Sequence, residues 1–124
     1  MRTITTLDVA LLRAALDAIE AHPEQFDDHA WAARTDAGEC YSLAARVCLL
    51  AGHSINWGRV NEHGNATFLT NGEAIPETAD ELLGLGVIDA HKLFDVGNDI
   101  ARTRKIAERL IKRATRGCGG RSAR

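Results

Sequence analysis

The side chains whose types and spacing most suggest chemistry are the cations near the C-terminus. Residues 102–124 hold nine Lys and Arg and a single acid, Glu108, whereas residues 1–101 hold six Lys and Arg and sixteen Asp and Glu. The first part of the chain therefore has a net charge of −10 and the last part +8, which together give the −2 of the whole chain. A clustered basic segment can contact phosphates, and such binding weakens as the salt concentration rises.

The candidate contact residues lie along the exposed arc of a predicted final helix and the segment behind it. They are Arg102, Lys105, Arg109, Lys112, Arg113, Arg116, Arg121 and Arg124. Two other interpretations fit the same residues, because cations stabilise the C-terminal end of a helix and the acidic body offers them intramolecular partners. Since no aromatic side chains are interleaved with these cations, single-stranded nucleic acid is the weaker expectation.

Residues 79–94 have the outline of a helix-turn-helix, because two short helical stretches are joined through glycine. In that motif the second helix enters the major groove of DNA. The exposed side chains of the second helix would be Asp89, His91, Lys92 and Asp95. Two of these four are carboxylates, which repel phosphate, and none is the Arg that reads guanine. The sequence therefore favours a plain helical hairpin here, and the DNA-reading alternative stays open.

The residue pattern gives little support for metal binding or catalysis. The histidines at positions 22, 29, 53, 63 and 91 are scattered, and Cys40, Cys48 and Cys118 form no Cys-x-x-Cys pair. Neither a nucleophile elbow nor a glycine-rich phosphate loop is present. We therefore expect a protein that is not an enzyme and has no cofactor, catalytic residue or metal ligand. A metal site assembled from distant His and Cys stays open.

Hydrophobic periodicity predicts about five helices. The first follows Thr5 and Thr6, which are good N-caps, and stops near His22 because Pro23 disfavours helix at the residue before it. The other helices are expected over residues 39–51, 77–83, 88–95 and 99–116. Residues 54–70 have the pattern of a β-hairpin that turns at 61–65. The predicted fold class is mainly α, a small bundle of about five helices with one short β-hairpin packed on it.

The predicted core collects the large apolar side chains that share a face in these elements. Its members are Leu12, Leu16, Ile19, Phe26, Trp31, Leu43, Val47, Leu50, Trp57, Phe68, Leu82, Leu83, Leu93, Phe94, Ile106 and Leu110, and Ile88 is also expected to be buried.

The 124 residues amount to one domain. Residues 1–116 are expected to form a single globular domain and residues 117–124 a flexible, basic, glycine-rich tail. No apolar run approaches the length that crosses a bilayer, so no membrane partner is expected. The first residues lack the pattern of a secretory signal, so a cytoplasmic location is expected.

Several motifs together carry a resemblance over about residues 10–112. They are His-Pro-Glu-Gln-Phe-Asp at 22–27, Trp31, the segment from Cys40 to Leu50-Ala51-Gly52, Ala-Asp-Glu-Leu-Leu-Gly-Leu at 79–85, Lys92-Leu93-Phe94 and Asn98. With these motifs the chain resembles a recurring class of small helical proteins of actinobacteria and their phages. That class has no established activity, so the resemblance implies a setting and no catalytic residue. Its members often show Cys-Gly-Thr at the start of the central helix and a second cysteine five residues on, whereas this chain has Cys40-Tyr41-Ser42 and Ala45.

These observations favour a non-enzymatic protein-interaction or accessory protein, one that is phage-encoded and acts on a host protein in the host cytoplasm if the resemblance holds. A protein partner or self-association is the leading expectation. The candidate partner surfaces are the predicted hairpin tip, Glu62, His63 and Gly64, and the exposed side of the last helix. The alternative is a nucleic-acid-binding regulator that uses the basic C-terminal helix and tail.

Overall fold

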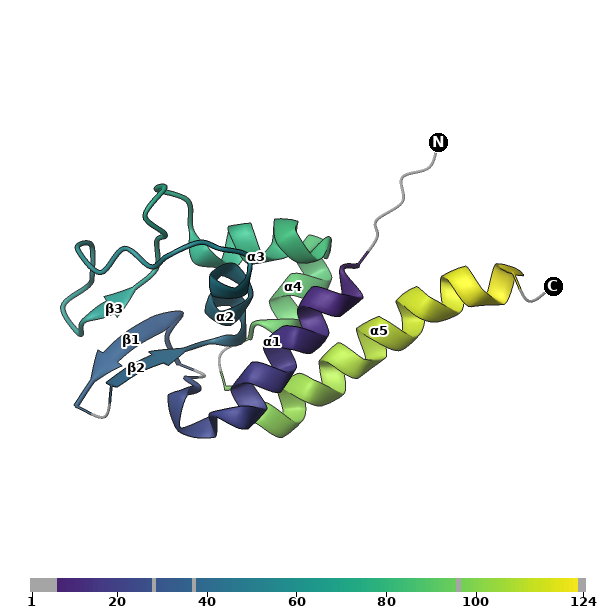
Figure 1. Cartoon of the computed structure of the whole chain (residues 1–124), viewed down its shortest axis with the longest axis horizontal. Coiled ribbons are helices and arrows are strands. Elements are labelled where there is room, and N and C mark those ends of the chain that lie inside the picture. Colours follow the sequence, from purple (N-terminus) through teal and green to yellow (C-terminus); the bar gives the residue numbers. More distant parts are fainter. Residues whose placement is uncertain (1–6, 28, 37, 96, 123–124) are drawn as a thin grey trace.

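The computed structural model describes residues 7–27, 29–36, 38–95 and 97–122, and for residues 116–122 it describes the backbone only. Helices dominate, with a small sheet at one end of the molecule (Figure 1). The elements are α1 (Val9–Ala21), a 3-10 turn η1 (Pro23–Gln25), β1 (Ala32–Thr35), β2 (Gly38–Tyr41), α2 (Leu43–Leu50), β3 (Asn65–Ala66), α3 (Ile75–Leu83), α4 (Val87–Leu93) and α5 (Ile100–Ser122).

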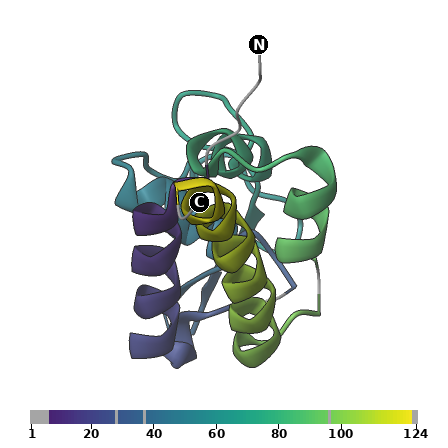
Figure 2. The same cartoon turned by 90° about the vertical axis from the view of Figure 1, so that its right-hand side faces the viewer.

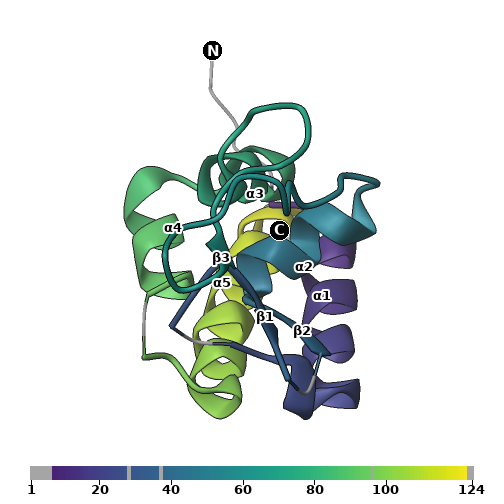
Figure 3. The same cartoon turned by 90° about the vertical axis from the view of Figure 1, so that its left-hand side faces the viewer.

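Helix α2 packs against both α1 and α3. The long helix α5 lies between α1 and α4, as Figure 2 shows from the C-terminal end. In Figure 3 the sheet end of the molecule is toward the viewer, with α5 behind it and α1 to one side. No helix in the described part of the chain is long and apolar enough to cross a membrane.

Helix α1 follows the predicted pattern closely. Its buried side chains are Leu12, Ala15, Leu16 and Ile19, which recur at the three- and four-residue spacing of one helical face. Asp8 caps the helix, because its Oδ1 accepts a hydrogen bond from the backbone N–H of Leu11 at 3.0 Å. The predicted caps Thr5 and Thr6 lie outside the described residues.

The predicted single hairpin is wrong, because the sheet has three strands in the order β2-β1-β3. The hairpin of β1 and β2 was not expected, and it pairs Ala32 with Tyr41 and Thr35 with Gly38. Residues 39–41, predicted to open the central helix, belong to β2 instead. That helix begins at Leu43 because Ser42 stops it: the Ser42 hydroxyl accepts the N–H of Ala45 at 3.1 Å, as N-cap residues do.

The expected hairpin over residues 54–70 is present in a reduced form. Isolated bridges join Ile55 to Leu69 and Val60 to Ala66, and only Asn65–Ala66 is a regular strand. That strand pairs with β1 through Ala32. The two hairpins are thereby joined in one sheet, which is why the predicted short hairpin does not have to be stable by itself.

Much of the predicted core is buried, with two clear errors. Leu50 is 47% exposed and Ile88 is 72% exposed. Leu50 is the last residue of the short helix α2, and Ile88 stands at the start of α4, which packs inward only through Ala90 and Leu93. The predicted core residues that are half-buried rather than buried are Phe26, Trp31, Trp57, Phe68, Leu82, Phe94 and Ile106.

Helix α5 continues past the predicted end near Arg116 and runs to Ser122. Its far end extends beyond the other helices in Figure 1. Glycine is a poor helix former, and for that reason the sequence predicts an earlier end, ahead of Gly117.

Candidate functional site

A groove of about 420 Å³ lies between α3 and α4. Residues of α3 and α4 line it, together with Trp31 and with Phe94 and Asp95, which follow α4. Its lining residues are Trp31, Pro76, Glu77, Asp80, Val87, Ala90, His91, Phe94 and Asp95. We call this hollow the α3–α4 groove. Ligand sites are commonly apolar clefts of this kind that carry a few polar groups.

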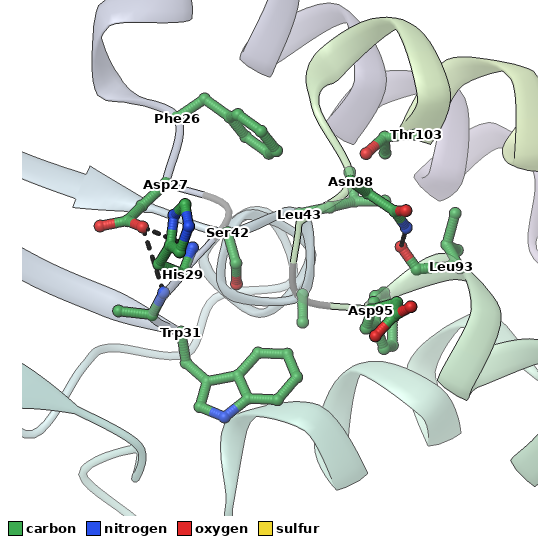
Figure 4. Close-up of a pocket in the computed structure, with 13 residues that line it drawn as sticks. Phe26, Asp27, His29, Trp31, Ser42, Leu43, Leu93, Asp95, Asn98 and Thr103 are labelled. Carbon is green, nitrogen blue, oxygen red and sulfur yellow. Dashed lines mark hydrogen bonds between the residues drawn. The ribbon is translucent and has the colours of Figure 1, made fainter.

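A smaller pocket of about 100 Å³ adjoins the groove. Figure 4 shows Phe26 and Trp31 on opposite sides of this pocket. Trp31 and Phe94 line both hollows, so this ring pair forms their common border. The rings meet edge to face, with centroids 6.4 Å apart and planes at 87°.

Hydrogen bonds hold the segments beside this border in place. The buried Asn98 donates from Nδ2 to the carbonyl oxygens of Lys92 at 2.9 Å and Leu93 at 3.2 Å, which ties down the end of α4. Its Oδ1 accepts from Nε of Arg102 at 3.1 Å, which joins the same residue to α5. On the Trp31 side, Oδ1 of Asp27 accepts the N–H of His29 at 2.8 Å.

The α3–α4 groove has an acidic lining. One carboxylate oxygen of Asp80, Oδ1, is buried and has no hydrogen-bond partner among the described residues. Burial raises the pKa of Asp80 above its ordinary value, and the negative charges of Glu81 and Glu77 raise it further. A cation bound in the groove would offset these negative charges and would lower the pKa of Asp80 again.

The mouth of the groove carries exposed apolar side chains. Val87 is 69% exposed and lines the groove, and the neighbouring Ile88 is also exposed. They lie at the start of α4, which follows α3 closely because Gly84 ends that helix with a left-handed φ of 74°. An apolar patch beside a hollow is typical of an interaction site.

The predicted basic residues differ in whether their side chains have a hydrogen-bond or ion-pair partner in the structure. Arg113 donates to Oδ2 of Asp89 at 2.6 Å, and Arg102 is bonded to Asn98. By contrast, Lys105, Arg109 and Lys112 are exposed and form no ion pair with any side chain that the structure describes. The side chains of Arg116 and Arg121 lie outside the described part, as does the whole of Arg124.

Arg104, a basic residue of α5 not among the predicted contacts, is the most heavily paired cation there. Its guanidinium bonds Glu20 on α1 and, at 2.6 Å, Glu108 on α5 itself. These bonds lower the pKa of Glu20 below its ordinary value. The ion pairs hold α5 against α1, so Arg104 serves the fold.

The predicted partner surface at residues 62–64 forms an exposed turn at the sheet end of the molecule. Oδ1 of Asn61 accepts the N–H groups of His63 at 2.8 Å and Asn65 at 3.0 Å, and Gly64 takes a φ of 80°. Glu62 and His63 form an exposed pair at 3.5 Å. The turn lies on the far side of the molecule from α5 (Figure 1), so the two predicted surfaces do not meet.

The described cysteines and histidines do not form a cluster that could bind a metal ion. No three His, Cys, Asp or Glu within the described ranges are placed to hold a metal ion. Cys48 is fully buried, and burial raises the pKa of its thiol to about 12. Its Sγ donates to the carbonyl oxygen of Ile75 at 3.6 Å, which indicates a packing role.

Comparisons with known proteins add no relative. No family model matches the chain, and neither a curated protein nor a solved structure resembles it significantly.

Sequence reasoning missed the α3–α4 groove. Glu77 and Asp80 read as ordinary surface acids of a helix, and Trp31 as a core residue. The groove exists only because the chain places Trp31 and Phe94 beside the start of α3. The available signal was the adjacency of Val87 and Ile88, two large apolar residues directly after a glycine.

Proposed function

We propose that this protein is a non-enzymatic interaction protein whose α3–α4 groove receives a basic side chain of a partner protein. The observation that carries the proposal is an open hollow in which the carboxyl groups of Glu77, Asp80 and Asp95 lie beside the rings of Trp31 and Phe94. The charges of Glu81 and Glu77 disfavour ionised Asp80, and a cation bound in the groove would offset them.

The groove favours an Arg or Lys side chain over a small cation. Trp31 and Phe94 offer apolar ring surface, and Pro76 and Val87 extend it toward the mouth. Arg and Lys carry an apolar stem that packs on such surface and a charged end that reaches a carboxylate. Ring faces also attract cations directly.

The exposed side chains at the mouth support a protein as the source of this cation. Val87 and Ile88 offer apolar area outside the groove that a lone amine would leave uncovered. Protein interfaces combine an apolar centre with Arg and aromatic residues. The resemblance to small proteins of actinobacteria and their phages supports a narrower proposal, a phage accessory protein that acts on a host protein in the host cytoplasm.

The test uses short synthetic peptides that differ at one central position, with Arg, Lys or uncharged norleucine flanked by leucines. Binding is followed by tryptophan fluorescence in a Trp57→Phe background, where Trp31 is the remaining tryptophan. We expect the Arg and Lys peptides to bind and the norleucine peptide to bind at least about tenfold more weakly, as the loss of a charge-assisted hydrogen bond implies.

The matched variants are Asp80→Asn in the groove and Asp36→Asn in the turn between β1 and β2, which remove the same charge. Asp80→Asn should abolish the preference for the basic peptides, and Asp36→Asn should leave it intact. The proposal is wrong if none of the peptides binds, or if both variants respond alike.

A further inference from the structure

A second surface, which shares no residue with the groove lining, consists of the three free cations of α5. Lys105, Arg109 and Lys112 follow one another at spacings of four and three residues, so they share one face of the helix. We call these three residues the basic stripe. The buried side of α5 carries Thr103, Ala107, Leu110 and Ile111, which are offset from the stripe around the helix.

The basic stripe is not used to hold the fold together. Arg104 and Arg113, which flank it on the helix surface, are bonded to the acids of α1 and α4. The acidic side chains available to α5 are therefore taken by other cations. Within the described part of the chain, no acid lies in ion-pair range of the three stripe residues.

The dimensions of the stripe fit a nucleic-acid backbone. At a helical rise of about 1.5 Å per residue, Lys105 and Lys112 are about 10 Å apart along the axis. Duplex DNA presents about six phosphate charges over that length.

The composition of this helix face favours nucleic acid over an acidic protein. The large exposed apolar residues among those described are Leu50, Val60, Val87 and Ile88, and none of them lies on α5. Protein interfaces need an apolar centre, whereas nucleic-acid interfaces are polar and positively charged. The stripe also has no aromatic ring on which a base could stack.

We propose that the basic stripe binds the phosphate backbone of a nucleic-acid duplex without reading its base sequence. This proposal is independent of the groove, since it uses other residues and a ligand of opposite charge. Three phosphate contacts make affinity fall about 40-fold between about 50 and about 200 mM salt.

The experiment measures the affinity of the full chain for a fluorescent DNA duplex of mixed sequence as a function of salt. The stripe variant is Lys105→Gln with Arg109→Gln and Lys112→Gln. The control is Arg13→Gln with Arg59→Gln and Lys92→Gln, which removes the same charge elsewhere. The stripe variant should bind far more weakly, with a log–log salt slope shallower by about three, and the control should keep the parent slope.

Three outcomes would overturn the proposal. The first is no binding at low salt. The second is an equal loss in both triple variants, which would mean that only net charge matters. The third is equally tight binding of polyglutamate, or salt-sensitive self-association in place of DNA binding, because either would assign the stripe to acidic protein surface. Circular dichroism of each variant confirms that loss of binding does not reflect unfolding.

Discussion

The indole of Trp31 meets the ring of Phe94 edge to face, with centroids 6.4 Å apart, at the border between the α3–α4 groove and the smaller pocket. The two residues are far apart in sequence, and they connect the segment before β1 with the end of α4. Since both rings are half-buried, the pair has apolar surface left for a ligand. The same contact thus supports the fold and shapes the proposed site.

Replacing Trp31 tests the contribution of this residue to the stability of the fold. Trp31→Ala should lower the free energy of unfolding by about 2–3 kcal/mol, less than for a fully buried tryptophan, because part of the ring already faces solvent. Trp31→Phe should recover most of that stability, since an aromatic ring still meets Phe94. Urea denaturation followed by circular dichroism measures the difference. A midpoint for Trp31→Ala equal to that of the parent would contradict the packing described here.

Asp80→Asn should leave the protein as stable as the parent or more stable at neutral pH. The Asp80 pKa is raised in the folded state from its ordinary value of 3.8, so ionisation of this carboxyl favours unfolding. Asp80 also lies near the C-terminal end of α3, where a negative charge opposes the helix dipole.

The pH dependence of this effect has a definite sign. The destabilisation caused by Asp80 is absent below its ordinary pKa and develops as the pH rises through the raised folded-state pKa. The stability gap between Asp80→Asn and the parent should therefore be present at neutral pH and close at about pH 3. Denaturation midpoints of both proteins at the two pH values test this, and a clear loss of stability in the variant at neutral pH would count against an unpaired Asp80.

Arg104→Gln should weaken the attachment of α5 to α1. The loss is expected to be about 1 kcal/mol or less, because the Arg104 and Glu20 side chains are partly exposed to solvent. The pKa of Glu20 is lowered on folding, so its contribution is present above the ordinary value of 4.5 and is lost as the pH falls through the folded-state pKa. Thermal melts should show a lower Tm for Arg104→Gln than for the parent at neutral pH, and equal Tm values at acidic pH. An equal Tm difference at both pH values would mean that the variant loses packing contacts and not a charge interaction.

The two described cysteines should differ in reactivity. Cys48 is buried with a thiol pKa of about 12, so about one part in ten thousand is thiolate at about pH 8. Cys40 is half-buried, so alkylation of the native protein should label it far sooner. Mass spectrometry of a Cys118→Ser variant after timed alkylation measures both. Comparable labelling of Cys48 would show that α2 opens readily.

Parts of the fold follow from local sequence signals. The face of α1 is fixed by the spacing of Leu12, Leu16 and Ile19, and its end by Pro23, so both could be predicted. The hairpin of β1 and β2 could not, because Ala32–Thr35 lacks the large β-branched and aromatic residues that mark strands. The cap at Ser42 was the missed signal, since a serine before a helical run separates strand from helix.

The groove was beyond sequence reasoning for a different reason. Which acids of a helix face solvent and which line a hollow depends on what packs beside them, and Trp31, from a distant part of the chain, lines the same hollow as Asp80. Ion pairs are likewise beyond prediction from the sequence alone. The sequence shows nine cations after residue 101, but only the fold distinguishes Arg104 and Arg113, which are paired, from Lys105 and Arg109, which are not.

The most direct test of the central claim is a nuclear magnetic resonance titration with the Arg-containing peptide. The indole N–H signals of Trp31 and Trp57 are assigned by comparison with the Trp57→Phe variant. We predict that the Trp31 signal shifts on titration together with backbone signals of residues 76–95, while the Trp57 signal stays in place. Shifts confined to other surfaces, or an unmoved Trp31 signal at saturating peptide, would contradict the assignment of the groove as the binding site.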